Sequence, residues 1–371
     1  MKNENNQVRV LAFYLPQYHS FPENDAWWGK GFTEWTNVRK AEPLYRGHYQ
    51  PQVPLGDDYY DLTDYSNMEK QMAQAGKSGI FGFCYYHYWF NGKLLMEKPL
   101  ENMRDHDGEK LPYCLCWANE PWTRAWDGKD KEVLMPQVYG DEEEWEQHFQ
   151  YLLTFFRDSF YLKENNAPVL VLYRSNSIKN CDKMAAYWDK RAREENFSGI
   201  YLVEEVNSFQ NVPVLQESKA YLEYEPLFTV NHRRSFTEKA GDKIRTLAFN
   251  LLTGNRCVHV YDYRMVWRNI LRRNEAPMRN KERFPGAFVR WDNTPRRGKD
   301  SIFYACASPK AFGRFMKKHL KRAEKNQSRY LFVNAWNEWG EGAYMEPDTR
   351  YGFAFLNALR RAKEDVGKSK C

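Results

Sequence analysis

"YLFVNAWNEWGEGAYMEP", residues 330–347, joins an apolar run to a dense group of polar side chains. The run "YLFV" is typical of a strand covered on both faces, as the strands of a parallel sheet are. Alternation along this strand places two sets of side chains on opposite sides: Leu331, Val333 and Ala335 on one, and Phe332, Asn334, Trp336 and Glu338 on the other. We expect the first set to meet helices and the second to point toward the interior of the fold.

Seven more short apolar runs resemble this strand, and helical patterns separate them. The eight predicted strands are 8–16, 79–89, 111–118, 168–174, 199–205, 221–228, 286–291 and 330–336. Amphipathic patterns predict helices over 64–76, 141–158, 182–196, 259–274, 308–325 and 353–366. Strands that alternate with helices in this way predict an α/β fold, a (β/α)8 barrel. A doubly wound sheet is less favoured, because "YLPQYHSFPEN" stands where a Gly-rich phosphate loop would follow the first strand.

The 371 residues are enough for about two average domains, but one barrel with insertions uses the same length. We therefore predict a single barrel domain over 1–371, with long loops at about 17–63 and 230–284. Ordered loops of this length usually serve function.

The bulk composition excludes several classes of protein. The net charge of +6 is a slight excess of 55 basic over 49 acidic side chains, which is typical of a mixed solvated surface rather than of a nucleic-acid binder. Seven scattered cysteines, an odd number, argue against a disulfide framework. "MKNENNQVRV" lacks the apolar core of a signal peptide, and no run approaches the length of a membrane span. These features predict a cytoplasmic protein without a membrane span; the oligomeric state stays open.

Acids, amides and aromatic rings gather where the predicted strands end. The carboxyl ends of barrel strands meet at one face, and that face holds the catalytic groups of barrel enzymes. Such a mixture of side chains is typical of a carbohydrate cleft. Further polar groups at strand ends are Arg174, Glu204, Glu205, Glu223 and Glu225. The candidate substrate-binding residues are Tyr18, His19, Tyr86, His87, Trp89, Trp117, Asn119, Glu120, Trp122, Arg124, Trp291, Asp292 and Asn337.

Glu338 and Glu341 are the candidate catalytic residues. We expect Glu338 at the top of the barrel interior, and three extended residues would carry Glu341 roughly 10 Å further along the chain. Gly340 and Gly342 permit a turn that brings Glu341 back. Two acids that flank one glycosidic bond can hydrolyse it, with retention when they are about 5–5.5 Å apart and inversion at about 6.5–9.5 Å. The spacing in the sequence leaves both outcomes open.

Other chemistries fit these residues less well. Glu346 and Asp348 could join Glu341 around a hard cation, but the segment is predicted to be a turn around Pro347. No G-x-S-x-G segment supports a serine nucleophile. We therefore expect no metal and no cofactor.

Six segments together resemble the glycoside hydrolase family 99-like group, which includes the WbsX-type proteins of bacterial polysaccharide gene sets. They are "AFYLPQYH" (12–19), "GFTEWTNV" (31–38), "FCYYHYWFNGK" (83–93), "CWANEPWTRAWDG" (116–128), "WDNTPRRG" (291–298) and "NAWNEWGEGAYMEPDTRYG" (334–352). The resemblance covers nearly the whole chain and implies a (β/α)8 barrel.

The resemblance also implies a mechanism, because family 99 enzymes cleave mannans and mannosides with retention through two Glu of this last segment. Glu338 would act as a base on the substrate 2-hydroxyl, whose oxygen then forms a 1,2-anhydro sugar. Glu341 would protonate the leaving oxygen and later activate water. These roles predict an ionised Glu338 and a Glu341 kept protonated by neighbours such as Trp339 or Tyr344.

Three functions follow from the sequence. The first is a retaining glycoside hydrolase that acts on a bacterial surface-type polysaccharide or oligosaccharide, with a mannoside-like substrate as one option. The second is a glycosyltransferase in polysaccharide assembly, such as that of O-antigen or capsule. The run "RRG" at 296–298 could hold its phosphate, but no diphosphate site is otherwise evident. The third is a glycan-binding barrel without catalysis.

Overall fold

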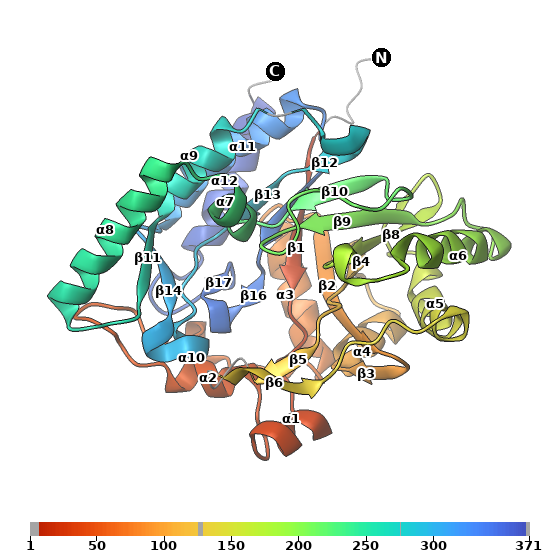
Figure 1. Cartoon of the computed structure of the whole chain (residues 1–371), viewed down its shortest axis with the longest axis horizontal. Coiled ribbons are helices and arrows are strands. Elements are labelled where there is room, and N and C mark those ends of the chain that lie inside the picture. Colours follow the sequence, from red (N-terminus) through yellow and green to blue (C-terminus); the bar gives the residue numbers. More distant parts are fainter. Residues whose placement is uncertain (1–6, 125–128, 275, 369–371) are drawn as a thin grey trace.

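A parallel barrel forms the centre of the molecule in the computed structural model, which describes residues 7–124, 129–274 and 276–368 (Figure 1). Its strands run in the order β12-β10-β9-β8-β4-β2-β1-β15-β13, and all the pairs between these neighbours are parallel. Their bounds are β1 (Arg9–Tyr14), β2 (Gly82–Phe90), β4 (Tyr113–Trp117), β8 (Ala167–Leu172), β9 (Tyr201–Val206), β10 (Ala220–Glu223), β12 (Glu282–Phe284), β13 (Gly286–Phe288) and β15 (Tyr330–Asn334).

The first and last strands of that order, β12 and β13, are separated only by Pro285. β12 pairs with β10, whereas β13 pairs with β15, so one interrupted strand closes the ring. Proline has no backbone N–H to donate to a neighbour, which explains the break at this position. Counting β12 and β13 as one strand gives the eight strands of a (β/α)8 barrel, and the predicted fold class is confirmed.

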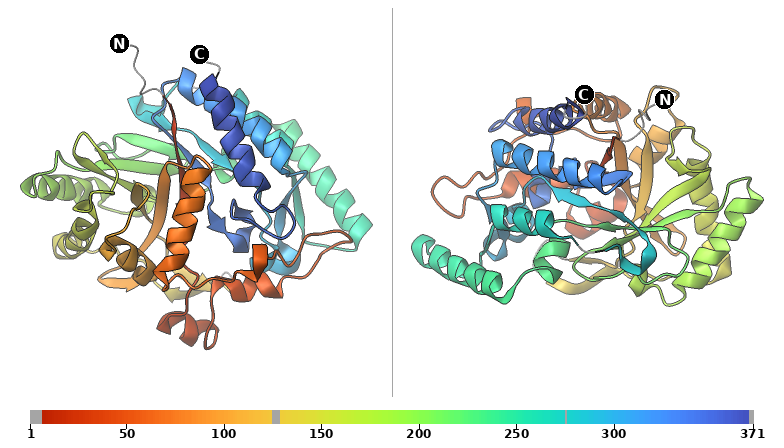
Figure 2. Two further views of the ribbon diagram at one scale, coloured as in Figure 1. Left: turned by 180° about the vertical axis from the view of Figure 1, so that it is seen from behind. Right: turned by 90° about the horizontal axis from the view of Figure 1, so that it is seen from above.

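Helices surround the barrel (Figures 1 and 2). The larger ones are α3 (Tyr65–Lys77), α4 (Glu97–Asp105), α5 (Glu142–Phe156), α6 (Cys181–Glu194), α8 (Phe236–Thr253), α9 (Tyr263–Arg272), α11 (Pro309–Lys325) and α12 (Ala354–Lys368). The shorter ones are α1 (Pro22–Trp28), α2 (Glu34–Lys40), α7 (Leu227–His232) and α10 (Thr294–Arg297). Outside the ring lie the short strands β3 (Lys93–Leu95), β5 (Trp122–Arg124), β6 (Lys129–Met135), β7 (Lys163–Glu164), β11 (His259–Asp262), β14 (Ile302–Ala305), β16 (Asn337–Glu338) and β17 (Ala343–Tyr344).

The segments predicted as long loops contain secondary structure of their own. Residues 17–63 include α1 and α2, and residues 230–284 include α8, β11 and α9. The predicted helix 259–274 is wrong in its first turn, where β11 pairs with β14. Asp262 ends that strand and caps α9, because its carboxylate accepts hydrogen bonds from the N–H groups of Arg264 and Met265.

Aromatic side chains fill the inside of the barrel. Phe13 of β1 packs against Tyr86, Tyr224 and Phe332, which come from three other strands or strand ends. The interior position predicted for Phe332 is therefore correct. The same prediction fails for Trp336, which packs against Phe83, because β15 ends at Asn334 and the alternation does not continue beyond it.

In the part of the chain that the structure describes, we find no helix that has both the length and the apolar character needed to cross a membrane.

Candidate active site

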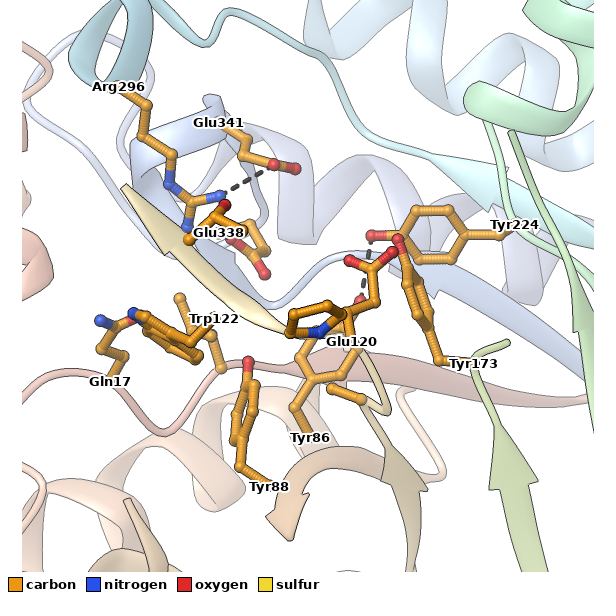
Figure 3. Close-up of a pocket in the computed structure, with 14 residues that line it drawn as sticks. Gln17, Tyr86, Tyr88, Glu120, Trp122, Tyr173, Tyr224, Arg296, Glu338 and Glu341 are labelled. Atoms are coloured by element: carbon orange, nitrogen blue, oxygen red, sulfur yellow. Dashed lines mark hydrogen bonds and ion pairs between the residues drawn. The ribbon is translucent and has the colours of Figure 1, made fainter. Parts of the chain in front are cut away.

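A cavity of about 220 Å³ opens at the carboxyl ends of the barrel strands (Figure 3). Carboxylates, one guanidinium and aromatic rings form its wall. The side chains labelled in Figure 3 are Gln17, Tyr86, Tyr88, Glu120, Trp122, Tyr173, Tyr224, Arg296, Glu338 and Glu341. Both predicted catalytic residues therefore line one cavity.

A tight turn after β15 places Glu338 and Glu341. Glu338 ends the short strand β16, which pairs with β17, and Glu341 ends the single 3₁₀ turn between them. Gly342 closes the turn in the left-handed conformation, at φ 59°. A Cβ atom added to Gly340 would lie 1.6 Å from Oε1 of Glu34, so only glycine allows that carboxylate so close. The glycines thus perform the predicted turn and also admit a third acid.

Two side chains fix this turn to the end of β1. Asn337 accepts a hydrogen bond from the N–H of Leu15 at 2.7 Å and donates one to the carbonyl oxygen of Leu15 at 2.9 Å. The Tyr18 hydroxyl donates to the carbonyl of Asn337 and accepts from the N–H of Trp339 at 3.2 Å. Because Asn337 and Tyr18 are buried, these bonds hold the backbone on both sides of Glu338.

One guanidinium joins the two candidate catalytic carboxylates. Arg296, on α10, contacts Glu341 at 2.8 Å and Glu338 at 3.0 Å. Its third nitrogen contacts Glu34, the first residue of α2, at 2.8 Å. Three carboxylates thus surround one cation, so the group would carry an excess of negative charge if every acid were ionised.

This arrangement raises the pKa of both candidate catalytic acids. Burial raises the pKa of Glu338 to about 8, because the attraction of Arg296 offsets only part of the desolvation and Glu341 and Glu34 add repulsion. Burial likewise raises the pKa of Glu341, against the opposing effect of Arg296. The predicted contrast, an ionised Glu338 beside a protonated Glu341, does not appear; the structure instead favours a pair that retains a proton near neutrality.

Asp292 lies beside the start of α10, the helix that carries Arg296. Its carboxylate accepts hydrogen bonds from Gln50 at 2.8 Å and from the Thr294 hydroxyl at 2.6 Å, and it lies 2.8 Å from Nε2 of His48. Its N–H donates to the carbonyl oxygen of Glu341 at 2.7 Å. Burial would raise the pKa of Asp292, but these partners outweigh it and lower the pKa. Asp292 therefore connects the start of α10 with the turn that carries Glu338 and Glu341.

Glu120 and aromatic rings form the rest of the wall. Glu120 pairs with Arg174 at 2.8 Å, and burial raises its pKa despite that partner. The Tyr86 hydroxyl donates to the Tyr224 hydroxyl at 3.0 Å. Trp122 is half-buried, packs edge-on against Tyr88 and stacks with Trp27.

Of the thirteen predicted substrate-binding residues, Tyr86, Glu120 and Trp122 line the cavity. Four others hold the wall in place without lining it: Tyr18, Asp292 and Asn337, described above, and Asn119. Asn119 accepts from the N–H of Arg174 at 2.8 Å and donates to its carbonyl oxygen at 2.9 Å. It thereby fixes the partner of Glu120.

Three predicted residues lie on the outer side of the sheet. His87 and Trp89 alternate with Tyr86 and Tyr88 along β2, so they point toward α5, where His87 contacts His148 at 2.9 Å. Trp89 stacks on the same His148 ring at 4.6 Å. Trp117 packs edge-on against that ring. These side chains form the packing between the sheet and α5, so the structure places them away from the cavity in which they were expected.

The last three predicted residues also lie away from the cavity wall. His19 is buried against the Pro16 carbonyl, at 3.0 Å, and against Phe21. Arg124, on the β5–β6 hairpin, contacts Glu132 of the same hairpin and the ring of Trp28, which ends α1. Trp291 is buried beside Tyr304. The segment "AWDG" at 125–128, part of the quoted motif 116–128, lies outside the described residues.

Other acids at the strand ends serve packing. Glu204 accepts hydrogen bonds from Ser175, Gln210, Ser218 and two backbone N–H groups. Glu223 and Glu225 both pair with Arg273, at 2.9 and 2.7 Å. These contacts satisfy the carboxylates within the protein.

Several cavity residues escaped the sequence reasoning as site residues. Tyr173 and Tyr224 stand next to charged residues at strand ends, and Tyr88 is two positions from Tyr86. Glu34 and Arg296 lie in two of the quoted motifs, but the sequence does not show that their side chains contact each other. Among the described residues, no group of three or more His, Cys, Asp or Glu is arranged to hold a metal ion.

The chain thus combines a (β/α)8 barrel with an acid-lined cavity, and comparison with known proteins identifies its family. Residues 10–359 match the family described as glycosyltransferase WbsX, and the chain belongs to that family. It is 35% identical over 363 residues to the uncharacterized protein WxcX of Xanthomonas campestris pv. campestris, strains B100 and ATCC 33913. The match covers 95% of this chain and 49% of each relative, so the chain spans about half their length.

Solved structures show the same fold at low sequence identity. The GH99 endo-alpha-mannosidase of Bacteroides thetaiotaomicron superposes with a TM-score of 0.53 at 12% identity, over 98% of both chains. A glycoside hydrolase-like protein superposes with a TM-score of 0.54 at 13% identity, over 97% of this chain and 95% of that one. The expected resemblance to family 99 and WbsX proteins is therefore confirmed.

Proposed function

We propose that this protein is a retaining glycoside hydrolase that cleaves a bacterial surface-type polysaccharide or oligosaccharide. The observation that carries the proposal is the pair Glu338 and Glu341, held by Arg296 at the wall of one cavity. Two neighbouring acids whose pKa values are raised by burial supply the acid and the base that glycoside hydrolysis needs.

In the family 99 mechanism, both acids take part in each of two steps. When the proton that the pair retains lies on Glu341, Glu338 is ionised. It then removes the proton of the substrate 2-hydroxyl, and that oxygen bonds to the anomeric carbon. The bond to the leaving oxygen breaks as Glu341 protonates it. Water, deprotonated by Glu341, then attacks the anomeric carbon of the 1,2-anhydro sugar. The bond between that carbon and the 2-oxygen breaks, and the 2-oxygen regains its proton from Glu338. Each carboxyl thus ends the cycle in its starting state.

The cavity wall suits a sugar. Tyr86, Tyr88 and Trp122 offer apolar faces with polar edges, and Glu120 offers hydrogen-bond acceptors. Glu341 is the more accessible acid, with 22% of its side chain exposed against 7% for Glu338. That difference favours Glu341 as the acid that reaches the leaving oxygen and later the water.

The test is hydrolysis of a panel of bacterial polysaccharides and mannosides, with product analysis by mass spectrometry and NMR. Glu338→Gln and Glu341→Gln should each lower turnover by at least about 100-fold, since general acid or base action is worth that much. Glu364→Gln, an exposed residue of α12, is the matched control and should keep the parent rate. Parent-like turnover in either active-site variant would remove that residue from the mechanism.

The name of the family favours one alternative, a glycosyltransferase in polysaccharide assembly. A transferase binds a sugar nucleotide, so a thermal-shift screen separates the two reactions. Stabilisation by nucleotide sugars, without hydrolysis of any oligosaccharide, would favour transfer. A third outcome would favour a glycan-binding barrel without catalysis. In that case the parent binds an oligosaccharide without hydrolysing it, and Glu338→Gln binds it equally well.

A further inference from the structure

Helix α8 (Phe236–Thr253) presents an unusual face to solvent. Its exposed residues include the large apolar side chains of Phe236, Ile244, Leu247, Leu251 and Leu252, which are 68–86% exposed. At 3.6 residues per turn, the first four of these fall within an arc of about 80°. A surface helix ordinarily turns its apolar stripe toward the core, so this stripe is the reverse of the usual arrangement.

The opposite face of α8 is fixed to the protein by polar contacts and one aromatic ring. Asp242 is buried and pairs with Arg234 at 2.7 Å and Arg245 at 2.6 Å. Asn250 donates to the Val258 carbonyl at 3.0 Å, and Phe249 packs against Tyr45 and Phe303. The helix therefore cannot roll to bury its apolar stripe without breaking these contacts.

Both ends of α8 are also formed. Ser235 and Glu238 make a capping box at its start, and Gly254 ends it in the left-handed conformation. Figures 1 and 2 show α8 at the edge of the molecule, away from the barrel. The stripe is thus a feature of a folded, projecting helix.

Positive charge accompanies the stripe. Lys243 and Lys239 lie at its edge on the helix surface, since they fall about 20° and 60° beyond Phe236. Both lysines are exposed, as is Arg256 just beyond the helix, whereas Asp242 of α8 is buried and paired with two arginines. A second copy of the chain would bring this charge against itself, which is unfavourable.

We infer that α8 docks on an anionic lipid surface, with its apolar stripe in the interface and its lysines toward the headgroups. Helices with Phe and Leu on one face and Lys beside it lie in such interfaces. Lysine stems bury along apolar surface while their charges stay in water, which fits Lys239 and Lys243 at the border of the stripe. This inference does not depend on the proposed function.

The test is co-sedimentation of the whole chain with vesicles of phosphatidylglycerol and phosphatidylcholine, and with vesicles of phosphatidylcholine alone. We expect binding to the anionic vesicles that weakens with salt. The double change Leu247→Ser with Leu251→Ser should weaken it about tenfold or more, from the apolar area lost. Lys239→Glu with Lys243→Glu should also weaken it, and Leu55→Ser with Val138→Ser, exposed apolar residues elsewhere, should not.

Circular dichroism and melting temperature show whether each variant folds. If the variant with both leucines replaced does not fold, the variant with both lysines replaced still tests the inference. Equal binding to both kinds of vesicle would overturn the role of charge and with it the inference. Absence of binding by the parent would also overturn it. A concentration-dependent dimer that Leu247→Ser with Leu251→Ser dissolves, without vesicle binding, would assign the stripe to a second copy instead.

Discussion

The tryptophans predicted to bind substrate differ in their surroundings. Trp122 is half-buried at the cavity, whereas Trp89 is 4% exposed and packs against α5. Trp122→Ala should raise KM several-fold with little change in unfolding free energy. Trp89→Ala should instead cost about 3–5 kcal/mol of stability, as deletion of a core aromatic does. Steady-state kinetics and urea unfolding of the two variants measure KM and the unfolding free energy. A raised KM for Trp89→Ala together with a loss of stability for Trp122→Ala would contradict this assignment.

Alternation explains why the sequence predicted some site residues and missed others. Every aromatic of "YYHYW" at 85–89 stood at a strand end, and only the phase of β2 decides that Tyr86 and Tyr88 face the cavity. The sequence does not give that phase, because a strand buried on both faces lacks the alternation of apolar and polar residues that normally marks its inner side. The acids Glu338 and Glu341 were predictable because two glycines marked their turn.

The raised pKa of Glu338 makes this residue costly for stability at neutral and alkaline pH. Its folded pKa of about 8 exceeds the ordinary 4.5, so ionisation is opposed in the folded state, and stability is lost as pH rises from about 4.5 to about 8. Glu338→Gln carries no such charge. Its melting temperature should match the parent near pH 4.5 and exceed it by a few degrees at pH 8, while activity is lost.

Scanning calorimetry at several pH values measures this difference. The carboxylate of Glu364 is half exposed, so Glu364→Gln provides the control. Its melting temperature should equal that of the parent at every pH. A melting temperature of Glu338→Gln that falls below the parent with rising pH would show that the ionised form is stabilised.

At the scale of elements, the turn that carries Glu338 and Glu341 is held to the end of β1 through Asn337. Asn337→Ala leaves the buried N–H and C=O of Leu15 without partners, at a cost of about 2–4 kcal/mol. It should also lower kcat by about 100-fold, through misplacement of Glu338, with a smaller effect on KM. Asn231→Ala removes an exposed side-chain bond of α7 and should change neither. Urea unfolding and kinetics measure both effects; unchanged kcat would make Asn337 purely structural.

Element prediction succeeded where local periodicity agreed with the final packing. Helices such as α3, α5 and α11 have buried apolar faces, and the predicted ranges match them closely. α8 was missed because its apolar residues do not face the core, although the segment "SFTE" at 235–238 carries the signature of a capping box. The strand β12 was missed because Pro285 separates it from the more apolar β13.

At the scale of the whole molecule, the barrel closes across Pro285, and a buried ionic cluster stabilises this region. Arg273, after α9, pairs with Glu223 of β10 and with Glu225, and Arg283 of β12 also pairs with Glu223 at 2.9 Å. Arg273→Leu leaves the two acids with less compensation and should cost about 3–5 kcal/mol. Arg272→Leu, an exposed neighbour, should cost under about 0.5 kcal/mol. Urea unfolding of both variants checks this, and equal stabilities would contradict it.

The whole-molecule fold was accessible from the sequence because eight apolar runs alternate with helices, whereas the contacts across the barrel were not. Arg296 lies 42 and 45 positions from the two acids that it binds and 262 positions from Glu34. No local pattern links such residues. The single-domain organisation stays a prediction, as do the location of the protein and its substrate.

The excess of carboxylates around Arg296 has a consequence for the ligands that the cavity should prefer. A permanently charged ammonium compound that occupies the cavity would supply the second cation that Glu34, Glu338 and Glu341 lack. Its affinity should rise as the pH passes through about 8, where the cluster loses its shared proton. A neutral analogue of the same shape should show no such rise, and calorimetric titration of the two compounds would separate electrostatic recognition from fit.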